Sequence, residues 1–206
     1  MKNPLHYQIS EYDCGPTSLL NAMSYLFPRE KIPPEIIRNI MLYCLDCYGP
    51  DGASGKSGTS RMAMMFLSNW LNGFGKAGYL PISSRHLSGD AVNFRQDSSL
   101  RDALRRGGAA VVLVDLDGWH YVLLTGIQGE RVYLFDPYYL DTPLRGEEIQ
   151  MVTDHPTAYN RIVPTWYFER ENLDLYALGP VENREAVLLF NEQTMLTEEN
   201  TLEYII

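Results

Sequence analysis

Residues 8–23 read QISEYDCGPTSLLNAM, and this stretch decides how the first half of the chain folds. From Leu19 onward its apolar residues recur at helical spacing, which predicts an amphipathic helix over residues 14–27 that ends before Pro28. Cys14 is the first residue of this helix. A helix N-terminus presents unpaired N–H groups and a partial positive charge, and this field favours a thiolate over a thiol. Cys14 is therefore a candidate nucleophile.

The residues around Cys14 suit a reacting sulfur. Gly15 adds no side chain, so a substrate carbonyl can approach closely, and Pro16 is tolerated in a first helical turn. Gln8 lies six residues earlier and can aim its amide N–H at the oxygen that becomes negative in acyl transfer. The backbone N–H of Cys14 would be the second donor. Each residue also has a plainer explanation, Cys14 as a small buried core residue and Gln8 as an exposed polar residue.

Three more helices are predicted from periodicity and capping residues. They cover residues 34–48, opened by Pro33 and Pro34; residues 61–74, capped by Thr59 or Ser60 and ended by Gly73 or Gly75; and residues 100–106, capped by Ser98 or Ser99. The Gly- and Ser-rich stretch 48–58 is predicted to be a loop.

Strand-like runs dominate the second half of the chain. They cover residues 109–116, 120–127, 131–137, 161–168, 173–179 and 184–190, with a shorter run near 79–83. A polar stretch at 141–156 is compatible with a helix. Helices followed by adjacent strands predict an α+β fold in which N-terminal helices pack on a mostly antiparallel sheet.

The chain of 206 residues is expected to form a single domain. Residues 1–75 form its helical half with the nucleophile, residues 76–190 its sheet half, and residues 191–206 an acidic tail that frays. The net charge of −9 argues against binding to nucleic acid and to anionic membranes. No apolar run approaches the roughly 20 residues that cross a bilayer, and no signal peptide is recognisable. Three cysteines fit a reducing cytoplasm.

A histidine and an aspartate in the strand-rich half are candidate partners for Cys14. Of the four histidines, only His120 opens an apolar strand, and Asp136 ends the next one, just before Pro137. A hairpin centred on Gln128 with an odd-numbered loop, 127–129, would place His120 opposite Asp136, with Cβ atoms about 4.5–5.5 Å apart. Asp136 would then orient the imidazole, and His120 would take the thiol proton. Alternatively, His120 is a satisfied core histidine and Asp136 an ordinary turn residue before proline.

Three segments together resemble a known family. QISEYDCGPTSLLNAM, GWHYVLLTGI and VYLFDPYY are similar to motifs of the bacteriocin-processing cysteine peptidases, which cleave after double-glycine leaders, and of their stand-alone relatives. The resemblance spans roughly residues 5–140 and leaves residues 165–206 unexplained. Family members are usually fused to a transporter with membrane helices and an ATPase, and this sequence shows neither, so a stand-alone member is expected.

The resemblance implies a papain-like fold and a set of site residues. Cys14 would be the nucleophile, His120 the general base, Asp136 the orienting acid and Gln8 the oxyanion-hole donor. The chain would be a cysteine peptidase or amide hydrolase that acts on a peptide-like substrate and needs no metal or cofactor. Two alternatives stay open: a thiol-dependent acyltransferase or peptide ligase that uses the same residues, and a non-catalytic peptide-binding module.

Other sequence motifs give weaker support for other kinds of site. Residues 50–57, PDGASGKS, have Pro50 where a phosphate-binding loop needs glycine, and they follow a helix rather than a strand. They are expected to form a flexible loop that could rim the cleft. Cys44 and Cys47 lack further metal-ligand partners, and as residues of one helix face they are expected to be core cysteines. Trp119 is expected either beside the reacting groups or in the core. Met62, Met64, Met65 and Trp70 are expected to pack a helix.

Overall fold

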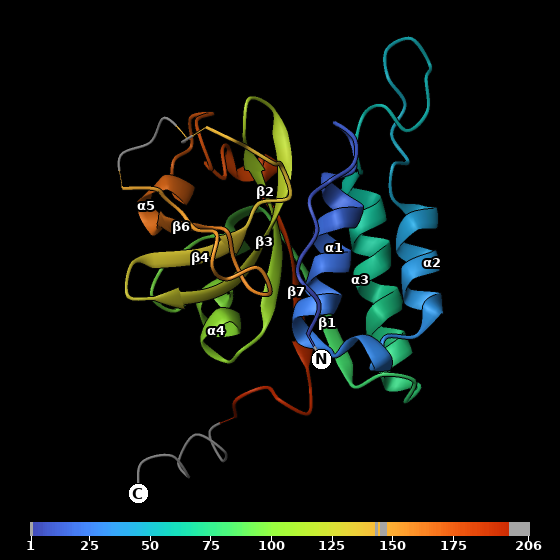
Figure 1. The fold of residues 1–206 in the computed structure, drawn as a ribbon. Coiled ribbons are helices and arrows are strands. Elements are labelled where there is room, and N and C mark those ends of the chain that lie inside the picture. The colour runs from blue at the N-terminus through green and yellow to red at the C-terminus, as the bar shows by residue number, and fades with distance from the viewer. Residues whose placement is uncertain (1, 143, 145–147, 198–206) are drawn as a thin grey trace, which may run out of the picture.

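The computed structural model describes residues 2–142, 144 and 148–197. A seven-stranded sheet has N-terminal helices on one face and shorter helices on the other (Figure 1). The strand order is β1-β7-β2-β3-β4-β6-β5, and every neighbouring pair is antiparallel. The predicted α+β fold, with N-terminal helices packed on an antiparallel sheet, is confirmed. No helix in the described part of the chain is long and apolar enough to cross a bilayer.

Helix α1 (Cys14–Leu26) begins at Cys14, as its sequence predicts. Its apolar face is fully buried at Leu19, and the hydroxyl of Ser18 donates to the carbonyl of Tyr121, 3.0 Å away in the sheet. A fully buried leucine side chain contributes about 1.5–3 kcal/mol. The helix ends where Phe27 turns to extended geometry before Pro28. Packing therefore holds the Cys14 end of α1 against the sheet.

Helices α2 (Pro34–Tyr43) and α3 (Arg61–Lys76) lie beside α1. Helix α2 ends at Tyr43, earlier than predicted, so Cys44 and Cys47 are not on a helix. Cys44 is buried and Cys47 is half-buried, so the expectation of two core cysteines was wrong for Cys47.

Helix α3 begins where Ser60 accepts a hydrogen bond from the Ala63 N–H at 3.1 Å. It runs through Gly73 and Gly75 rather than ending there. A Cβ on Gly75 would lie 1.8 Å from the Ile82 carbonyl oxygen, so this glycine allows close approach of the neighbouring strand.

Successive side chains along the sheet strands point alternately into two apolar layers. They are β1 (Ile82–Ser88), β2 (Ala109–Asp115), β3 (Trp119–Gln128), β4 (Arg131–Phe135), β5 (Gln150–Met151), β6 (Arg161–Pro164) and β7 (Glu185–Asn191). Val111 and Leu123 belong to the layer under α1 and α3, whereas Val112 and Val122 belong to the layer that contains α4 (Ser99–Arg105) and α5 (Thr165–Phe168). This alternation of side chains with a period of two residues, apolar on both sides, is typical of strands whose two faces are both buried.

Several predicted elements differ from the structure. Residues 161–168 are a strand followed by the short helix α5. Residues 173–179 form no strand, and the described part of 141–156 contains no helix. The strand expected near 79–83 extends to Ser88. Of the predicted acidic tail, residues 198–206 lie outside the described residues.

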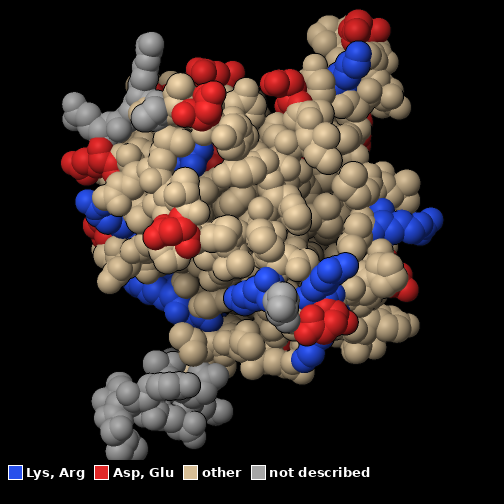
Figure 2. Space-filling model, in the orientation of Figure 1, with Lys and Arg blue, Asp and Glu red and all other residues tan. Residues whose placement is uncertain are grey.

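Charged side chains are unevenly distributed on the face shown in Figure 2. Acidic side chains gather toward the top of the view, the end of the molecule at which α3 begins, and basic side chains lie mostly toward the bottom, near the N-terminus. On this face, the end that carries the start of α3 therefore shows more acidic side chains than the opposite end.

Candidate active site

A β-bulge brings His120 and Asp136 to the same face of the sheet. The β3–β4 hairpin pairs Gln128 with Arg131, so its loop has two residues and not the predicted three. That register alone would turn His120 and Asp136 to opposite faces. The register shifts between Leu124 and Gly126, and the extra residue restores the shared face. The predicted register was wrong, but the two side chains meet.

The bulge is anchored by helix α1. Its extra residue, Thr125, has a carbonyl that accepts a hydrogen bond from the Tyr25 hydroxyl at 2.8 Å. The Thr125 hydroxyl donates to the Tyr133 carbonyl of β4 at 3.3 Å. These side chains satisfy polar groups that a bulge removes from the regular ladder.

Asp136 is fully buried and holds the His120 ring. Nε2 of His120 lies 2.9 Å from Oδ1 of Asp136. The Tyr138 N–H donates to the same oxygen at 2.9 Å, and the Tyr176 hydroxyl donates to Oδ2 at 2.6 Å. Burial raises the pKa of Asp136, but the hydrogen bonds and charge of His120, together with Tyr176 and Tyr138, outweigh it and lower the pKa. The carboxylate is therefore held in its charged form.

The backbone of Asp136 is fixed by one side chain. Asn160 accepts from the Asp136 N–H and donates to the Asp136 carbonyl, both at 2.8 Å. Asn160 is itself buried, directly before strand β6. This paired contact fixes the position from which the carboxylate reaches His120.

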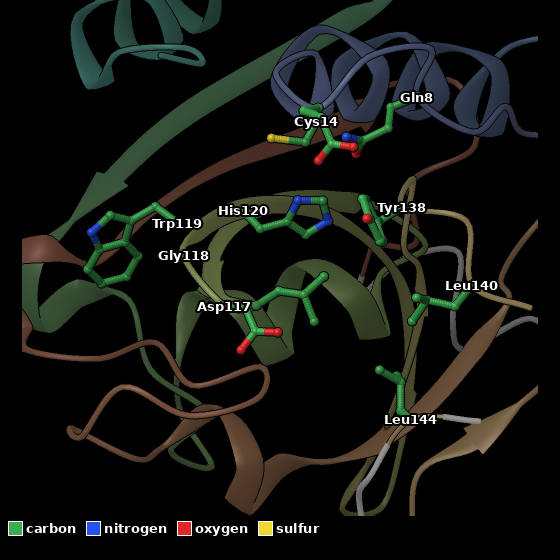
Figure 3. A pocket seen from close by; sticks show the side chains of 11 residues that line it. Gln8, Cys14, Asp117, Gly118, Trp119, His120, Tyr138, Leu140 and Leu144 are labelled. Atoms are coloured by element: carbon green, nitrogen blue, oxygen red, sulfur yellow. The ribbon is translucent and has the colours of Figure 1, made fainter. Parts of the chain in front are cut away.

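Cys14 lies on the other side of the His120 ring. Nε2 binds Asp136, so Nδ1 is left free, and Cys14 lies beside the imidazole (Figure 3). Burial lowers the pKa of His120, but hydrogen bonds and negative charge from Asp136 and Cys14 outweigh it and raise the pKa to about 9. At neutral pH the ring is therefore an imidazolium between two acidic groups.

The loop before α1 places Gln8 next to Cys14 (Figure 3). The Gln8 backbone N–H donates to the Pro137 carbonyl at 2.8 Å, which ties this loop to the segment after Asp136. Its side-chain Nε2 donates to the Ser10 carbonyl at 2.7 Å. An amide nitrogen has two hydrogens, so one N–H of Gln8 anchors the side chain and a second is available to the cleft.

Asp13 shapes this loop. Its carboxylate accepts hydrogen bonds from the Ile9 N–H at 3.0 Å and from both the N–H and the hydroxyl of Ser10 at 2.7 Å. Burial raises the pKa of Asp13, but the hydrogen bonds from Ile9 and Ser10 outweigh it and lower the pKa. Asp13 stands in the N-cap position of α1 but bonds this loop instead of capping the helix.

Cys14 lies where two hollows meet. One, of about 340 Å³, is lined by Gln8, His120 and the exposed Asp117 among others. The other, of about 250 Å³, is lined by Thr59, Arg61 and Glu185 among others. Cys14 and Trp119 line both hollows. A peptide that extends from one hollow to the other across Trp119 would therefore lie next to the Cys14 sulfur.

Three expectations about the cleft are now decided by geometry. Trp119 is 44% exposed at the cleft, so it is not a core tryptophan; a Cβ on Gly179 would lie 2.9 Å from its ring. Ser57 and Gly58 line the second hollow, so the predicted loop does rim the cleft. Gly15 is buried, and a Cβ there would lie 2.4 Å from the Thr59 hydroxyl oxygen, so it makes room for Thr59 rather than for substrate.

Sequence reasoning missed several residues that support this site. Tyr176 lay in a segment predicted as a strand, and Asn160 lay just before one. Neither residue has a spacing relative to Asp136 that could signal the contact. Asp13 directly precedes Cys14, and an aspartate three residues after a serine is a recognisable loop-forming pattern, so this contact has a signal in the sequence.

The raised pKa of His120 predicts a pH-dependent stability. An unfolded histidine titrates near pH 6.5, so the His120 contribution is fully present below that pH and is lost as pH rises through about 9. We expect a loss of about 3 kcal/mol in the free energy of unfolding over this range. Urea unfolding between pH 6 and 9.5 measures it.

Asp136→Asn is the control for this titration. Burial raises the pKa of the Cys44 thiol to about 12, so Cys44 also lowers stability at high pH, equally in both proteins. The difference between wild type and Asp136→Asn therefore isolates the His120–Asp136 pair. Parallel pH curves for the two proteins would contradict the assignment.

Comparison with known proteins gives likeness at the level of fold. No protein-family model and no curated protein sequence matches the chain. A solved double glycine motif protease from an AMS/PCAT transporter, in complex with the leader peptide, is similar with a TM-score of 0.43 and 15% identity, covering 91% of this chain and 89% of that one. The peptidase domain of Streptococcus mutans ComA is similar with a TM-score of 0.40 and 14% identity, covering 91% and 98%. Of these two solved proteins, one is a double glycine motif protease and the other a peptidase domain.

Proposed function

We propose that the chain is a papain-like cysteine peptidase or amide hydrolase, folded as a single domain, that acts on a peptide-like substrate. Cys14 is the nucleophile, His120 the acid and base, Asp136 the residue that orients it, and Gln8 an oxyanion donor. The observation that carries the proposal is the buried His120–Asp136 pair, whose free ring nitrogen faces a thiol at an open cleft. None of these roles needs a metal or a cofactor.

The proposed reaction has two halves. The Cys14 thiolate attacks the amide carbonyl carbon, the C–N bond breaks, and the His120 imidazolium gives its proton to the leaving amine. A water molecule then attacks the thioester carbonyl while His120 takes one of its protons. The acid product leaves, and the proton returns the site to the thiolate–imidazolium pair. Asp136 stays ionised throughout and stabilises the imidazolium.

Trapping the acyl-enzyme tests this function. The full chain is incubated with a library of peptide p-nitroanilides, and release of the chromophore is followed together with the intact mass of the protein. We expect turnover of some members and a transient mass increase that maps to Cys14. If no member is cleaved and no adduct forms on Cys14, the hydrolase assignment fails.

Gln8→Ala is expected to lower kcat by about 100- to 1000-fold, because one of two donors to the oxyanion is lost. Alkylation by iodoacetamide forms no oxyanion, so its rate at Cys14 should stay within twofold or so of wild type. The measurement compares both rates in the same preparation. A kcat within a few-fold of wild type would remove Gln8 from the proposed mechanism.

Acyl transfer to an amine is a second candidate function, favoured by the two hollows that meet at Cys14. An acceptor could occupy one hollow while the acyl group occupies the other. Adding glycinamide to a cleaved peptide substrate decides between them: a transferase gives the amide product in preference to the acid. A peptide-binding module without catalysis would instead bind peptides and turn over none.

A further inference from the structure

A buried tyrosine and a buried arginine stand behind the candidate site. Tyr176 is completely buried, and its hydroxyl donates to Oδ2 of Asp136 at 2.6 Å, on the opposite side of the carboxylate from His120. The Arg161 guanidinium is close enough to this phenol to oppose the rise in the Tyr176 pKa that burial and Asp136 cause, and its Nη1 donates to the Asn160 carbonyl at 2.8 Å. Arg161 is 3% exposed, so its positive charge sits inside the protein.

These groups follow one another as neighbours, and acidic and basic groups alternate among them. Cys14 and Asp136 are the acidic groups, His120 lies between them, and Arg161 lies behind the Tyr176 phenol. A buried cation is costly unless an opposite charge compensates it. Nε of Arg161 is buried and has no hydrogen-bond partner among the described residues, so hydrogen bonds satisfy only part of the guanidinium.

The backbone holds Tyr176 in an uncommon conformation for this contact. Its φ is +58°, a left-handed geometry that bulky residues rarely adopt. The Tyr176 N–H donates to the Asp115 carbonyl at 2.8 Å, and the Asp115 N–H donates to the Ala177 carbonyl at 2.9 Å. The end of strand β2 therefore fixes this segment in both directions. Such outliers mark places where the surrounding structure imposes a geometry.

We propose that Tyr176 and Arg161 act as positioning residues that set how strongly Asp136 holds the proton on His120. They touch neither Cys14 nor the cleft. By drawing negative charge of the carboxylate toward themselves, they leave the imidazolium able to give up its proton. The inference rests on the proposed function only in that this positioning would serve catalysis. The contacts around Asp136 are present whether or not the protein turns over a substrate.

The groups that face this pair come from several elements. Asp136 is faced by His120 from β3, by Tyr176, and by the N–H of Tyr138, with Arg161 of β6 behind the phenol. His120 is faced on its other side by Cys14 of α1. Removing the phenol oxygen therefore changes one side of Asp136 only, whereas removing the guanidinium also takes a donor from the Asn160 carbonyl.

An NMR titration of His120 in the full-length protein tests the proposal. The imidazole signal of His120 is identified as the one that disappears from the spectrum of His120→Ala. Tyr176→Phe should raise the pH midpoint of His120 by about one unit, a tenfold gain in proton affinity, because the carboxylate loses a donor and holds the imidazolium more tightly. Arg161→Met should shift it in the same direction, and Arg161→Lys, which keeps the charge, should shift it less.

Tyr133→Phe is the matched control, since its hydroxyl bonds Gln128 at 2.9 Å at the far end of the same hairpin. It should leave the midpoint unchanged. If Arg161→Met fails to fold, Tyr176→Phe decides alone, because it removes a single oxygen. A midpoint that does not move, or that falls, in folded Tyr176→Phe overturns the proposal. Titration needs no substrate, so this outcome is separate from any failure to find peptidase activity.

Discussion

Cys14→Ser is expected to lower peptide hydrolysis by about 10⁶-fold, the scale seen when a nucleophile is removed from a comparable enzyme. A thiolate is a far better nucleophile than a neutral hydroxyl, and a serine hydroxyl gives up its proton far less readily than a thiol. The substitution exchanges sulfur for oxygen in a buried side chain, so the fold should persist. The rate of hydrolysis of the best p-nitroanilide substrate measures the loss of activity, and thermal unfolding measured in parallel shows whether the fold persists.

Cys47→Ser is the matched control for this substitution. Cys47 is half-buried, lies after helix α2 and lines neither hollow, so its replacement should leave turnover unchanged. Activity of Cys14→Ser within tenfold of wild type would show that another group attacks the substrate.

Asp136→Ala is expected to damage both stability and activity. The substitution leaves His120, Tyr176 and the Tyr138 N–H without their shared acceptor at a buried position. Breaking a buried pair in this way costs about 3–5 kcal/mol of unfolding free energy. Loss of the orienting carboxylate should also lower kcat by about 10⁴-fold.

Asp136→Asn separates these two effects. The amide keeps the volume and the acceptor for Tyr176 but cannot stabilise an imidazolium, so it should retain more stability than Asp136→Ala while losing similar activity. Urea unfolding and kcat are measured for both variants. Full activity in a folded Asp136→Asn protein would contradict the role proposed for this carboxylate.

Local patterns in the sequence predict the parts of the site that lie on regular elements. The helix from Cys14 follows from apolar spacing, and Pro28 ends it. The strands that carry His120 and precede Asp136 follow from apolar runs. Strand order predicts that His120 and Asp136 are neighbours, but the hairpin loop has two residues and not three, and the bulge at Thr125 restores their shared face.

The remaining features depend on tertiary contacts that no local pattern records. The bulge at Thr125 requires the Tyr25 hydroxyl from a helix 100 residues away. Gly75 reads as a helix end, but it sits inside α3 because Ile82 packs against it. The run around Tyr176 has strand-like composition, yet its backbone turns so that the phenol reaches Asp136.

The pH dependence of Cys14 alkylation tests the central claim most directly. Iodoacetamide is reacted with the full-length protein between pH 4 and 10, with and without His120→Ala, and labelling of Cys14 is followed by mass spectrometry. The proposed pairing of Cys14 with His120 predicts a labelling midpoint at lower pH in the wild type than in His120→Ala, where it should be the ordinary cysteine value of about 8.5. A wild-type midpoint near that ordinary value, unchanged by His120→Ala, would contradict it.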